Sequence, residues 1–329
     1  MSKNIHAGTK RQKAVELLHR GDLNAAKLLL EEVCTTDQND AEAWYWLGAV
    51  YQHLNAQPEA KACYTQVVGL RPRQPEAHYY LGNIYLELNQ LDDAATCFQQ
   101  AVALKPDYIE AHNNLGFVLE RQKKYALAAE SYRNAVRIDS QRAELHSNLG
   151  NMLKAMERFA DAEACYRRAL ELSPDQADAY NNLGNVLADQ GRFDEATAFL
   201  QRAIKTHPGL PDLYYNLGSI LRDRGRVKEA IAYYDRAIAL NPDFAEAHWN
   251  RSMALLLAGD FQRGWIDYEW KWRRGGKQRP LTPSTWDGSD LHGRSVFLHA
   301  EQGLGDELFF LRFAMELKRR GAGSVMYRA

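Results

Sequence analysis

The hydrophobic and polar pattern of this chain repeats every 34 residues over most of its length. In six consecutive blocks, the first of which starts at Ala41, apolar or aromatic side chains stand at positions 4, 7 and 11 and glycine stands at position 8. These positions share one face of an α-helix, which turns once every 3.6 residues or so. A second apolar series at positions 20 and 24 follows a polar gap, and position 32 is proline in five blocks. Because proline interrupts a helix, each block is predicted to form two helices.

Small side chains mark the places where the two helices of a block are expected to pack. Position 8 is glycine in six consecutive blocks and position 20 is alanine in the same six, which allows close approach of the helices. Each pair leaves an apolar face that only the next pair can cover, so the pairs should stack into a solenoid. The blocks run 41–74, 75–108, 109–142, 143–176, 177–210, 211–244 and 245–278.

The spacing of Leu-Gly, Ala, aromatic residue and Pro resembles the tetratricopeptide (TPR) repeat. The resemblance implies an all-α superhelical solenoid of antiparallel helix pairs, whose first helices line an inner, concave surface. Residues 1–40 are expected to be a helical region with a degenerate capping repeat, and residues 41–244 to form six repeats. Residues 245–274 are expected to be a divergent capping repeat, since Arg251-Ser252 replaces Leu-Gly there.

Asparagine, a poor helix former, recurs at position 6 of five consecutive blocks. Position 6 lies opposite the apolar stripe, so these side chains are expected to point away from the core into the groove. A carboxamide can pair with both the N–H and the C=O of a peptide backbone, which predicts binding of an extended peptide. Solvated surface without a binding role is the alternative. The predicted peptide-binding residues are Asn114, Asn148, Asn182, Asn216 and Asn250, together with Asn83, Asn151, Asn185, Tyr79, Tyr80 and Tyr215.

Two other recurring residue types have a structural explanation as well as a functional one. An acid occupies position 2 of all seven blocks, where it favours the helix dipole; an acidic stripe that selects basic guests is the alternative. His78, His112 and His146 share position 4, but one histidine per repeat is too widely spaced to hold a metal ion. Aromatic packing is therefore expected for them, and no metal site is predicted.

Charge and composition narrow the classes of partner. With 41 basic and 42 acidic residues, the formal net charge is −1, which disfavours nucleic acid as a partner. No apolar run is long enough to span a membrane and no signal peptide is evident, so a cytoplasmic protein is expected. The groove positions carry no repeated Lys or Arg, unlike TPR domains that clamp a carboxylate. The expected partners are proteins or unstructured peptide segments, and self-association is left open.

After Ala258 the composition changes. Trp265, Tyr268 and Trp272 form an aromatic stripe that predicts either a contact with another domain or a cap on the solenoid. Residues 275–294, rich in Gly, Pro and Ser, are expected to be a connector. Residues 295–329 then predict a strand at 295–300, a helix at 306–320 and a strand at 324–328, which is the start of a βαβ unit.

The segments "GWIDYEWKWR" and "LHAEQGLGDELFFLRF" after a TPR array resemble bacterial proteins with a GT-B-type, heptosyltransferase-like glycosyltransferase domain. The asparagines are similar to those of protein O-GlcNAc transferases. The resemblance implies that Asp306 would deprotonate the acceptor; a helix N-cap is its alternative role. Since only about 35 residues of such a domain are present, no activity and no cofactor are expected of this chain. A nucleotide sugar would belong to a complete domain. The hypotheses are thus a peptide-binding scaffold and the substrate-recruiting arm of a glycosyltransferase.

Overall fold

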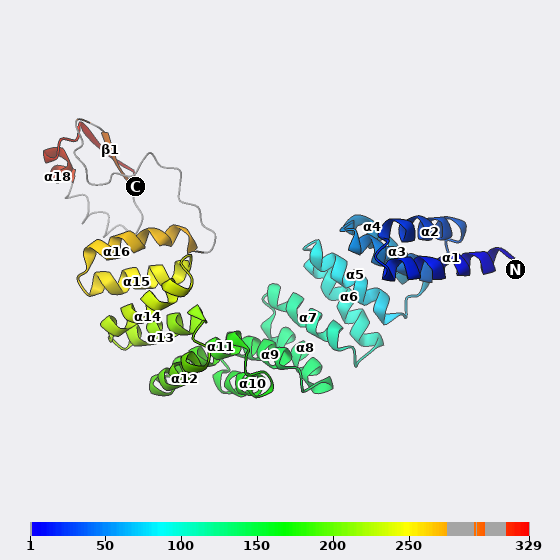
Figure 1. The fold of residues 1–329 in the computed structure, drawn as a ribbon, viewed down its shortest axis with the longest axis horizontal. Helices are drawn as coiled ribbons and strands as arrows, with labels where there is room; N and C mark the ends of the chain where they lie inside the picture. The colour runs from blue at the N-terminus through cyan, green and yellow to red at the C-terminus, as the bar shows by residue number, and fades with distance from the viewer. Residues whose placement is uncertain (1, 275–292, 294, 300–313, 329) are drawn as a thin grey trace. The chain divides into compact units, whose positions relative to one another are not determined.

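The computed structural model describes residues 2–274, 293, 295–299 and 314–328. The chain divides into two compact units, Met1–Glu269 and Trp270–Ala329. Each unit is described by itself below, and Figure 1 labels their helices and strands.

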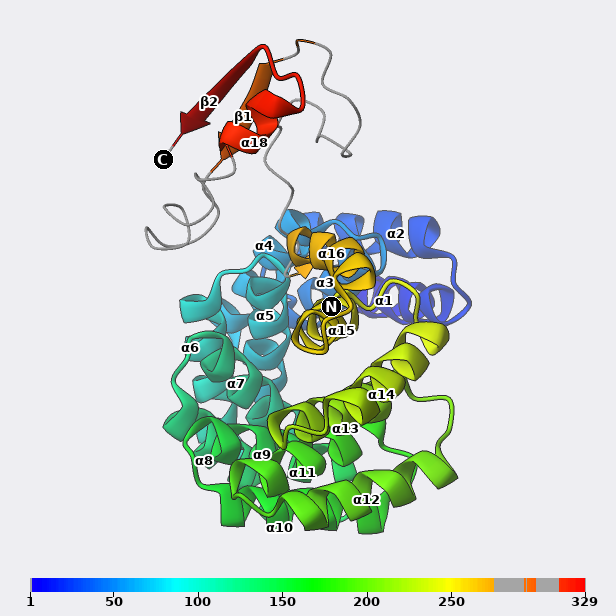
Figure 2. The same cartoon turned by 90° about the vertical axis from the view of Figure 1, so that its left-hand side faces the viewer.

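Unit 1 consists of paired helices that follow one another in chain order (Figures 1 and 2). Each first helix from α3 on occupies positions 1–13 of its block, and each second helix up to α14 occupies positions 17–30. The predicted antiparallel helix pairs and solenoid are therefore confirmed. The first helices are α3 (Ala41–His53), α5 (Pro75–Glu87), α7 (Ile109–Arg121), α9 (Ala143–Ala155), α11 (Ala177–Asp189), α13 (Pro211–Asp223) and α15 (Ala245–Leu257). The second helices are α4 (Gln57–Leu70), α6 (Leu91–Leu104), α8 (Tyr125–Ile138), α10 (Phe159–Leu172), α12 (Phe193–Thr206), α14 (Val227–Leu240) and the shorter α16 (Phe261–Tyr268).

Two further helices precede the regular blocks. They are α1 (Ser2–His19) and α2 (Leu23–Thr36), and they pack on each other and on α3. Ala26 and Leu30 of α2 are fully buried, so this pair covers the apolar end of the first regular block. The pair lies within residues 1–40, where the sequence predicts a degenerate capping repeat, and that role stays a prediction.

The turn between the two helices of a pair has the same backbone shape in every block. Position 15 has a positive φ throughout, at Asn55, Asn89, Lys123, Glu157, Gly191, Gly225 and Gly259. Glycine adopts this left-handed conformation without strain, whereas Lys123 and Glu157 adopt it against the steric cost of a β-carbon. The repeat therefore keeps the same left-handed turn at position 15 even where the residue there disfavours a positive φ.

Glycine at position 8 makes room for the large side chain at position 24 of the same block. A β-carbon at Gly150 would lie 2.7 Å from the ring of Tyr166, and one at Gly116 would lie 2.8 Å from the ring of Tyr132. Both tyrosines are essentially inaccessible to solvent. The close approach of the two helices that the sequence predicts is thus confirmed, and its cause is a buried aromatic ring against bare backbone.

The last pair of unit 1 inverts this arrangement of small residues. Position 8 is Ser252, which is fully buried, and position 20 is Gly264 instead of alanine. A β-carbon at Gly264 would lie 2.7 Å from Leu256, so the small residue that the helix packing needs has moved to the second helix. The departure from the repeat pattern at Arg251-Ser252 is therefore compensated by packing.

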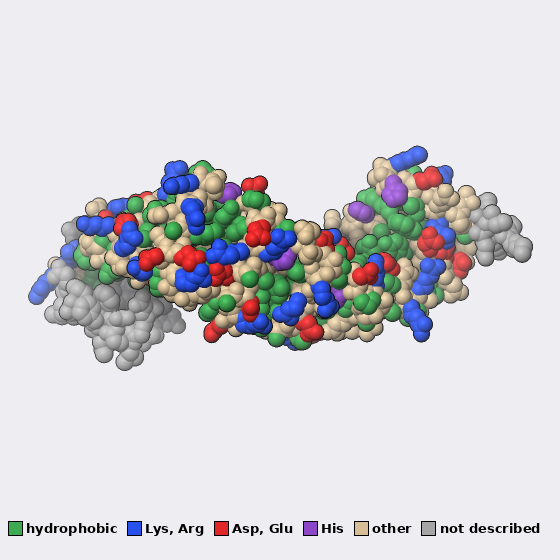
Figure 3. Space-filling view, turned by 90° about the horizontal axis from the view of Figure 1, so that it is seen from below, with side chains coloured by type: hydrophobic (Ala, Val, Ile, Leu, Met, Phe, Trp, Pro, Cys, Tyr) green, Lys and Arg blue, Asp and Glu red, His purple; other side chains and the backbone are tan. Residues whose placement is uncertain are grey.

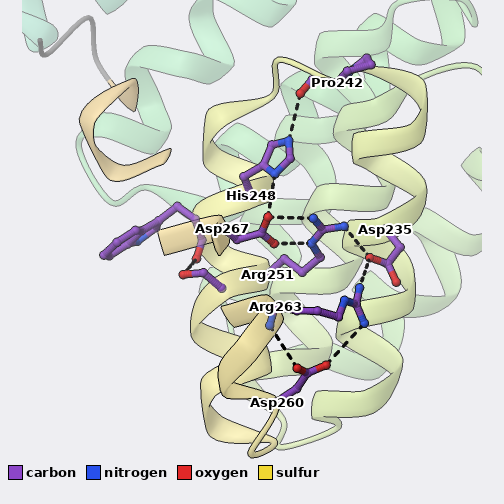
Figure 4. Close-up of polar contacts among 9 residues, drawn as sticks. Asp235, Pro242, His248, Arg251, Asp260, Arg263 and Asp267 are labelled. Carbon is purple, nitrogen blue, oxygen red and sulfur yellow. Dashed lines mark hydrogen bonds and ion pairs between the residues drawn. The ribbon is translucent and has the colours of Figure 1, made fainter. Parts of the chain in front are cut away.

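A polar cluster fastens this last pair (Figure 4). Asp267, only 4% exposed, accepts two hydrogen bonds from Arg251, at 2.5 Å from Nε and 2.9 Å from Nη2. Arg251 Nη1 donates to Asp235 at 2.6 Å, and His248 Nδ1 lies 3.2 Å from Asp267. Arg263 joins at the exposed side through Asp235. These contacts tie α14, α15 and α16 together at the end of the repeats.

A short 3-10 helix (Glu269–Trp272) spans the boundary between the units. Unit 2 contains β1 (Ser295–His299), α18 (Ala314–Arg319) and β2 (Ser324–Arg328). The strands β1 and β2 pair in parallel, with Ser295 opposite Ser324. Both predicted strands are thus confirmed, and α18 lies within the predicted helix. No helix in the described ranges is both long and apolar enough to cross a membrane.

Candidate functional site

The first helices of neighbouring pairs lie side by side along one face of unit 1. Helix α11 contacts both α9 and α13, and α13 contacts α15, so residues at equal positions of successive first helices are neighbours. The asparagines at position 6 (Asn114, Asn148, Asn182, Asn216 and Asn250) lie on this face and are called the asparagine ladder below. This face is the candidate site.

Most ladder residues donate a hydrogen bond to the preceding repeat. Asn182 Nδ2 donates to Asn151 Oδ1 at 3.0 Å, and the same oxygen accepts a bond from Tyr166 Oη at 2.7 Å. Asn250 Nδ2 lies 3.4 Å from Ser219 Oγ, which also accepts a bond from Tyr234 Oη. In both cases the side chain at position 9 accepts one hydrogen bond from the buried tyrosine at position 24 of its own block and another from the asparagine at position 6 of the next block.

The other ladder bonds vary this scheme. Asn114 Nδ2 donates to Asn83 Oδ1 at 2.9 Å, again from position 6 to position 9. The block before Asn148 has Phe117 at position 9, which offers no acceptor, and Asn148 donates instead to Asn113 Oδ1, at position 5, over 3.2 Å. Asn250 also donates to the hydroxyl of Tyr215, likewise at position 5, over 3.0 Å.

These bonds correct one part of the sequence interpretation. The asparagines are half-buried between repeats, and Asn216 is only 7% exposed, so they do not simply point away from the packing core. The bonds were missed because each partner lies 31 or 35 residues away, and the repeat pattern does not specify the rotation between pairs. The recurrence of Asn or Ser at position 9 beside Tyr at position 24 is the signal that could have revealed them.

A hollow of about 410 Å³ opens on the same face at α11, α13 and α15. It is referred to below as the hollow. Four of the predicted peptide-binding asparagines line it, together with the predicted Tyr215. The full lining is Asn151, Asp178, Asn181, Asn182, Asn185, Asp212, Tyr215, Asn216, Phe244 and Glu246. The structure thus brings amides, carboxylates and aromatic rings from successive repeats to one place.

Three acids at position 2 contribute to the hollow. Asp178, Asp212 and Glu246 make no ion pair with any residue in the described part of the chain. By contrast, Glu42 and Glu110 at the same position pair with Arg11 and Arg142. Desolvation raises the pKa of Asp212, and the charges of Asp178 and Glu246 raise it further. These three carboxylates therefore lie close enough to raise the pKa of Asp212 without an ion-pair partner in the described part of the chain. On the face that Figure 3 shows, charges of both signs are mixed.

The remaining predicted site residues lie elsewhere. Tyr79 and Tyr80 are half-buried and pack edge-on against each other at 5.3 Å, within an aromatic cluster that includes Tyr64. In unit 1, Trp265 is 52% exposed and packs against Tyr268 at 5.2 Å. Trp272 belongs to unit 2, and the predicted interdomain contact of these aromatic residues stays a prediction. Asp306 and the predicted connector 275–294 lie outside the described residues, apart from Gly293 in that connector.

The histidines at position 4 join each repeat to the one before it. Nε2 of His78, His112 and His146 lies 2.8–3.0 Å from the carbonyl oxygen of the residue six positions earlier. Tyr214 Oη makes the equivalent bond to Pro208 at 3.1 Å. Aromatic packing accounts for only part of their role, because the shared feature is a ring with a hydrogen-bond donor. No metal-binding cluster occurs among the residues that the structure describes.

One of these bonds predicts a pH dependence of stability. Burial lowers the pKa of His112 below its ordinary value of 6.5, an effect that the Pro106 carbonyl opposes and Arg137 reinforces. The unfolded chain therefore binds a proton at a pH where the folded chain stays neutral, so the free energy of unfolding should fall as the pH drops below about 6.5. His112→Tyr should flatten this dependence, as followed by urea denaturation between pH 5 and 7 or so. An unchanged slope in the variant would contradict the prediction.

Family comparisons agree with the geometry. A model described as TPR repeat matches residues 82–123 and 218–259. Two models described as tetratricopeptide repeat match residues 107–173 and 148–211. The chain carries tetratricopeptide repeats. A further model, described as anaphase-promoting complex, cyclosome, subunit 3, matches residues 19–101. No curated protein matches the chain.

Solved TPR structures are similar in fold. YrrB, described as a TPR protein with an unusual peptide-binding site, is 24% identical, with a TM-score of 0.48 over 60% of this chain and 98% of its own. MamA from Desulfovibrio magneticus RS-1 is 25% identical, with a TM-score of 0.48 over 52% of this chain and 96% of its own. A TPR protein from Parabacteroides merdae ATCC 43184 is 14% identical, with a TM-score of 0.52 over 76% and 98%.

Proposed function

We propose that the TPR repeats of this chain form a protein-interaction scaffold that binds an extended polypeptide along the first helices of unit 1. The observation that carries the proposal is the hollow, where asparagines of successive repeats meet beside aromatic side chains. Polar groups that converge with aromatic rings in one concavity are the usual make-up of a binding site.

The hydrogen bonds of the asparagine ladder suggest how a guest would bind. Asn114, Asn148 and Asn182 use Nδ2 for the neighbouring repeat, and no hydrogen bond in the described part of the chain reaches their Oδ1 atoms. The bond made by Nδ2 fixes the amide plane, so Oδ1 is held ready to accept from a backbone N–H of the guest. Packed helices lie about 8–10 Å apart and an extended chain rises about 3.3 Å per residue. One ladder residue would then meet about every third guest residue.

The energy of such contacts favours a weak and broadly selective site. A hydrogen bond contributes about 0.5–1.5 kcal/mol net, and association itself costs several kcal/mol. Backbone contacts carry little information about the guest sequence. Additional contacts to the side chains of the guest are therefore needed for useful affinity.

The test is a peptide array probed with the full chain. We compare wild type with the variant that carries Asn114→Ala, Asn148→Ala, Asn182→Ala and Asn216→Ala. The variant is expected to lose most binding across the array, because the shared backbone contacts are removed. Circular dichroism checks that the helices are retained.

The matched control carries Asn24→Ala and Asn134→Ala, which lie on the second helices α2 and α8. It should bind as wild type does. If the fourfold variant also binds as wild type, the ladder serves only to join repeats and the proposal is wrong.

A second proposal is that the repeats recruit substrates for a glycosyltransferase domain. The parallel strands β1 and β2 with α18 between them in sequence favour it, since this is the expected start of an α/β domain. Asp306 would then be the catalytic base. A transfer assay with a nucleotide sugar and an array-selected peptide tests this role in a chain that carries a complete domain of this type: Asp306→Asn should abolish transfer, and undiminished transfer would contradict it.

A further inference from the structure

The asparagine ladder is interrupted at one joint between repeats, and that joint lies at the hollow. In the described part of the chain, Asn216 makes no side-chain hydrogen bond, although it is only 7% exposed. Its two potential partners in the preceding repeat are Asn181 at position 5 and Asn185 at position 9. Residues at these positions accept the bonds of Asn148 and Asn182 at other joints. Asn216 bonds to neither.

The unused groups at this joint are mainly acceptors. Asn181 Oδ1 is buried without a hydrogen-bond partner. Asp178, Asp212 and Glu246 surround the same hollow, and no ion pair to them occurs within the described ranges. None of the described residues that line the hollow is Lys or Arg. A buried unpaired acceptor is costly, so this set calls for a guest that brings several donors and positive charge.

Aromatic rings complete the arrangement. Phe244 and Tyr215 pack together with their centroids 5.0 Å apart, and both line the hollow. A cation over an aromatic face gains additional attraction, and a guanidinium can stack on the ring while its N–H groups reach carboxylates. Aromatic rings beside unpaired acids therefore favour a basic side chain over a neutral polar one.

We infer that the hollow binds a basic side chain of the guest polypeptide, with Asp178, Asp212 and Glu246 pairing its charge and Asn216 accepting one of its N–H groups. This inference rests on the proposed peptide-binding function and specifies the class of guest. The acids at position 2 thus have a role here beyond stabilising their helices. The pKa of Asp212, which desolvation and its acidic neighbours raise, should be lowered again by the positive charge of the guest.

The experiment uses two fluorescent 15-residue peptides of Gly and Ser with a variable residue at every third position. One peptide carries arginine there and the other carries citrulline, which has the same shape without the charge. Fluorescence anisotropy with the full chain at low salt should show the arginine peptide binding about tenfold or more tightly than the citrulline peptide.

Two triple variants separate the hollow from the general charge of the chain. Asp178→Asn, Asp212→Asn and Glu246→Gln together should weaken the arginine peptide about tenfold and leave the citrulline peptide unaffected. Glu76→Gln, Glu110→Gln and Glu144→Gln remove three acids from the same position of other first helices, with the same change in net charge. This control should change arginine binding by less than about threefold.

The outcomes distinguish the inference from the function on which it rests. Equal binding of the two peptides, or equal loss in the two triple variants, would overturn the basic-guest inference while leaving peptide binding in place. Absence of binding by both peptides to wild type would overturn the inference and the peptide-binding function together.

Discussion

Tyr166→Ala is expected to lower the free energy of unfolding by about 3–5 kcal/mol. Tyr166 is fully buried, and its ring lies against the backbone at Gly150, where helix packing leaves no side chain to move into the space. The substitution also removes the bond from Tyr166 Oη to Asn151, which in turn accepts from Asn182 of the next repeat. Urea denaturation followed by circular dichroism measures the change.

Tyr166→Phe is the matched control, because it keeps the ring and removes only the hydroxyl. It should cost about 1 kcal/mol, the usual net value of one hydrogen bond. Each repeat in an array is stabilised by its contacts with the neighbouring repeats. Hydrogen exchange of the variant should therefore be faster than that of wild type in α11 as well as in α9 and α10. A loss below about 1 kcal/mol for Tyr166→Ala would mean that the neighbouring helices collapse into the cavity.

Asp267→Ala is expected to be the second most damaging change, at about 3 kcal/mol. It leaves the half-buried Arg251 with Asp235 as its remaining carboxylate partner among the described residues and removes the contact of His248. An uncompensated buried charge costs more than the intact pair contributes. The loss should be local, so hydrogen exchange should quicken in α15 and α16 before it does in the central repeats.

Arg263→Ala tests the same cluster at its exposed end. The side chain of Arg263 is half-exposed where it meets Asp235, so its removal should cost less than about 1 kcal/mol. If Asp267→Ala and Arg263→Ala destabilise α15 and α16 equally, the buried position of Asp267 does not matter and the explanation is wrong.

Features that depend on one block could be predicted from the sequence. Gly150 and Tyr166 belong to the same helix pair, and the repetition of a small and a large residue at these positions implies their contact. The ends of the second helices were predicted from proline, yet α8 ends at Ile138 with Ser140 in place of proline. The second helix therefore ends at position 30 of the block even where no proline stands at position 32.

Features that depend on the joint between blocks could not be predicted. Asn182 and Asn216 are the same residue at the same position, but Asn182 bonds to the preceding repeat and Asn216 does not. The difference lies in the geometry of the joint between two blocks, which no single block encodes. For the same reason, the sequence marks Arg251 as an exception without indicating that Asp267 is its partner.

The ladder bonds have a mechanical consequence. Each one crosses a joint between two helix pairs, as the bond from Asn182 to Asn151 does, so bending of the stack must stretch or shorten it. The row of hydrogen-bonded amides therefore resists bending of the stack along this face. Asn216 makes no such bond to α11 in the described part of the chain. A guest bound at the hollow would contact both α11 and α13 and so bridge the joint that the ladder leaves unbridged.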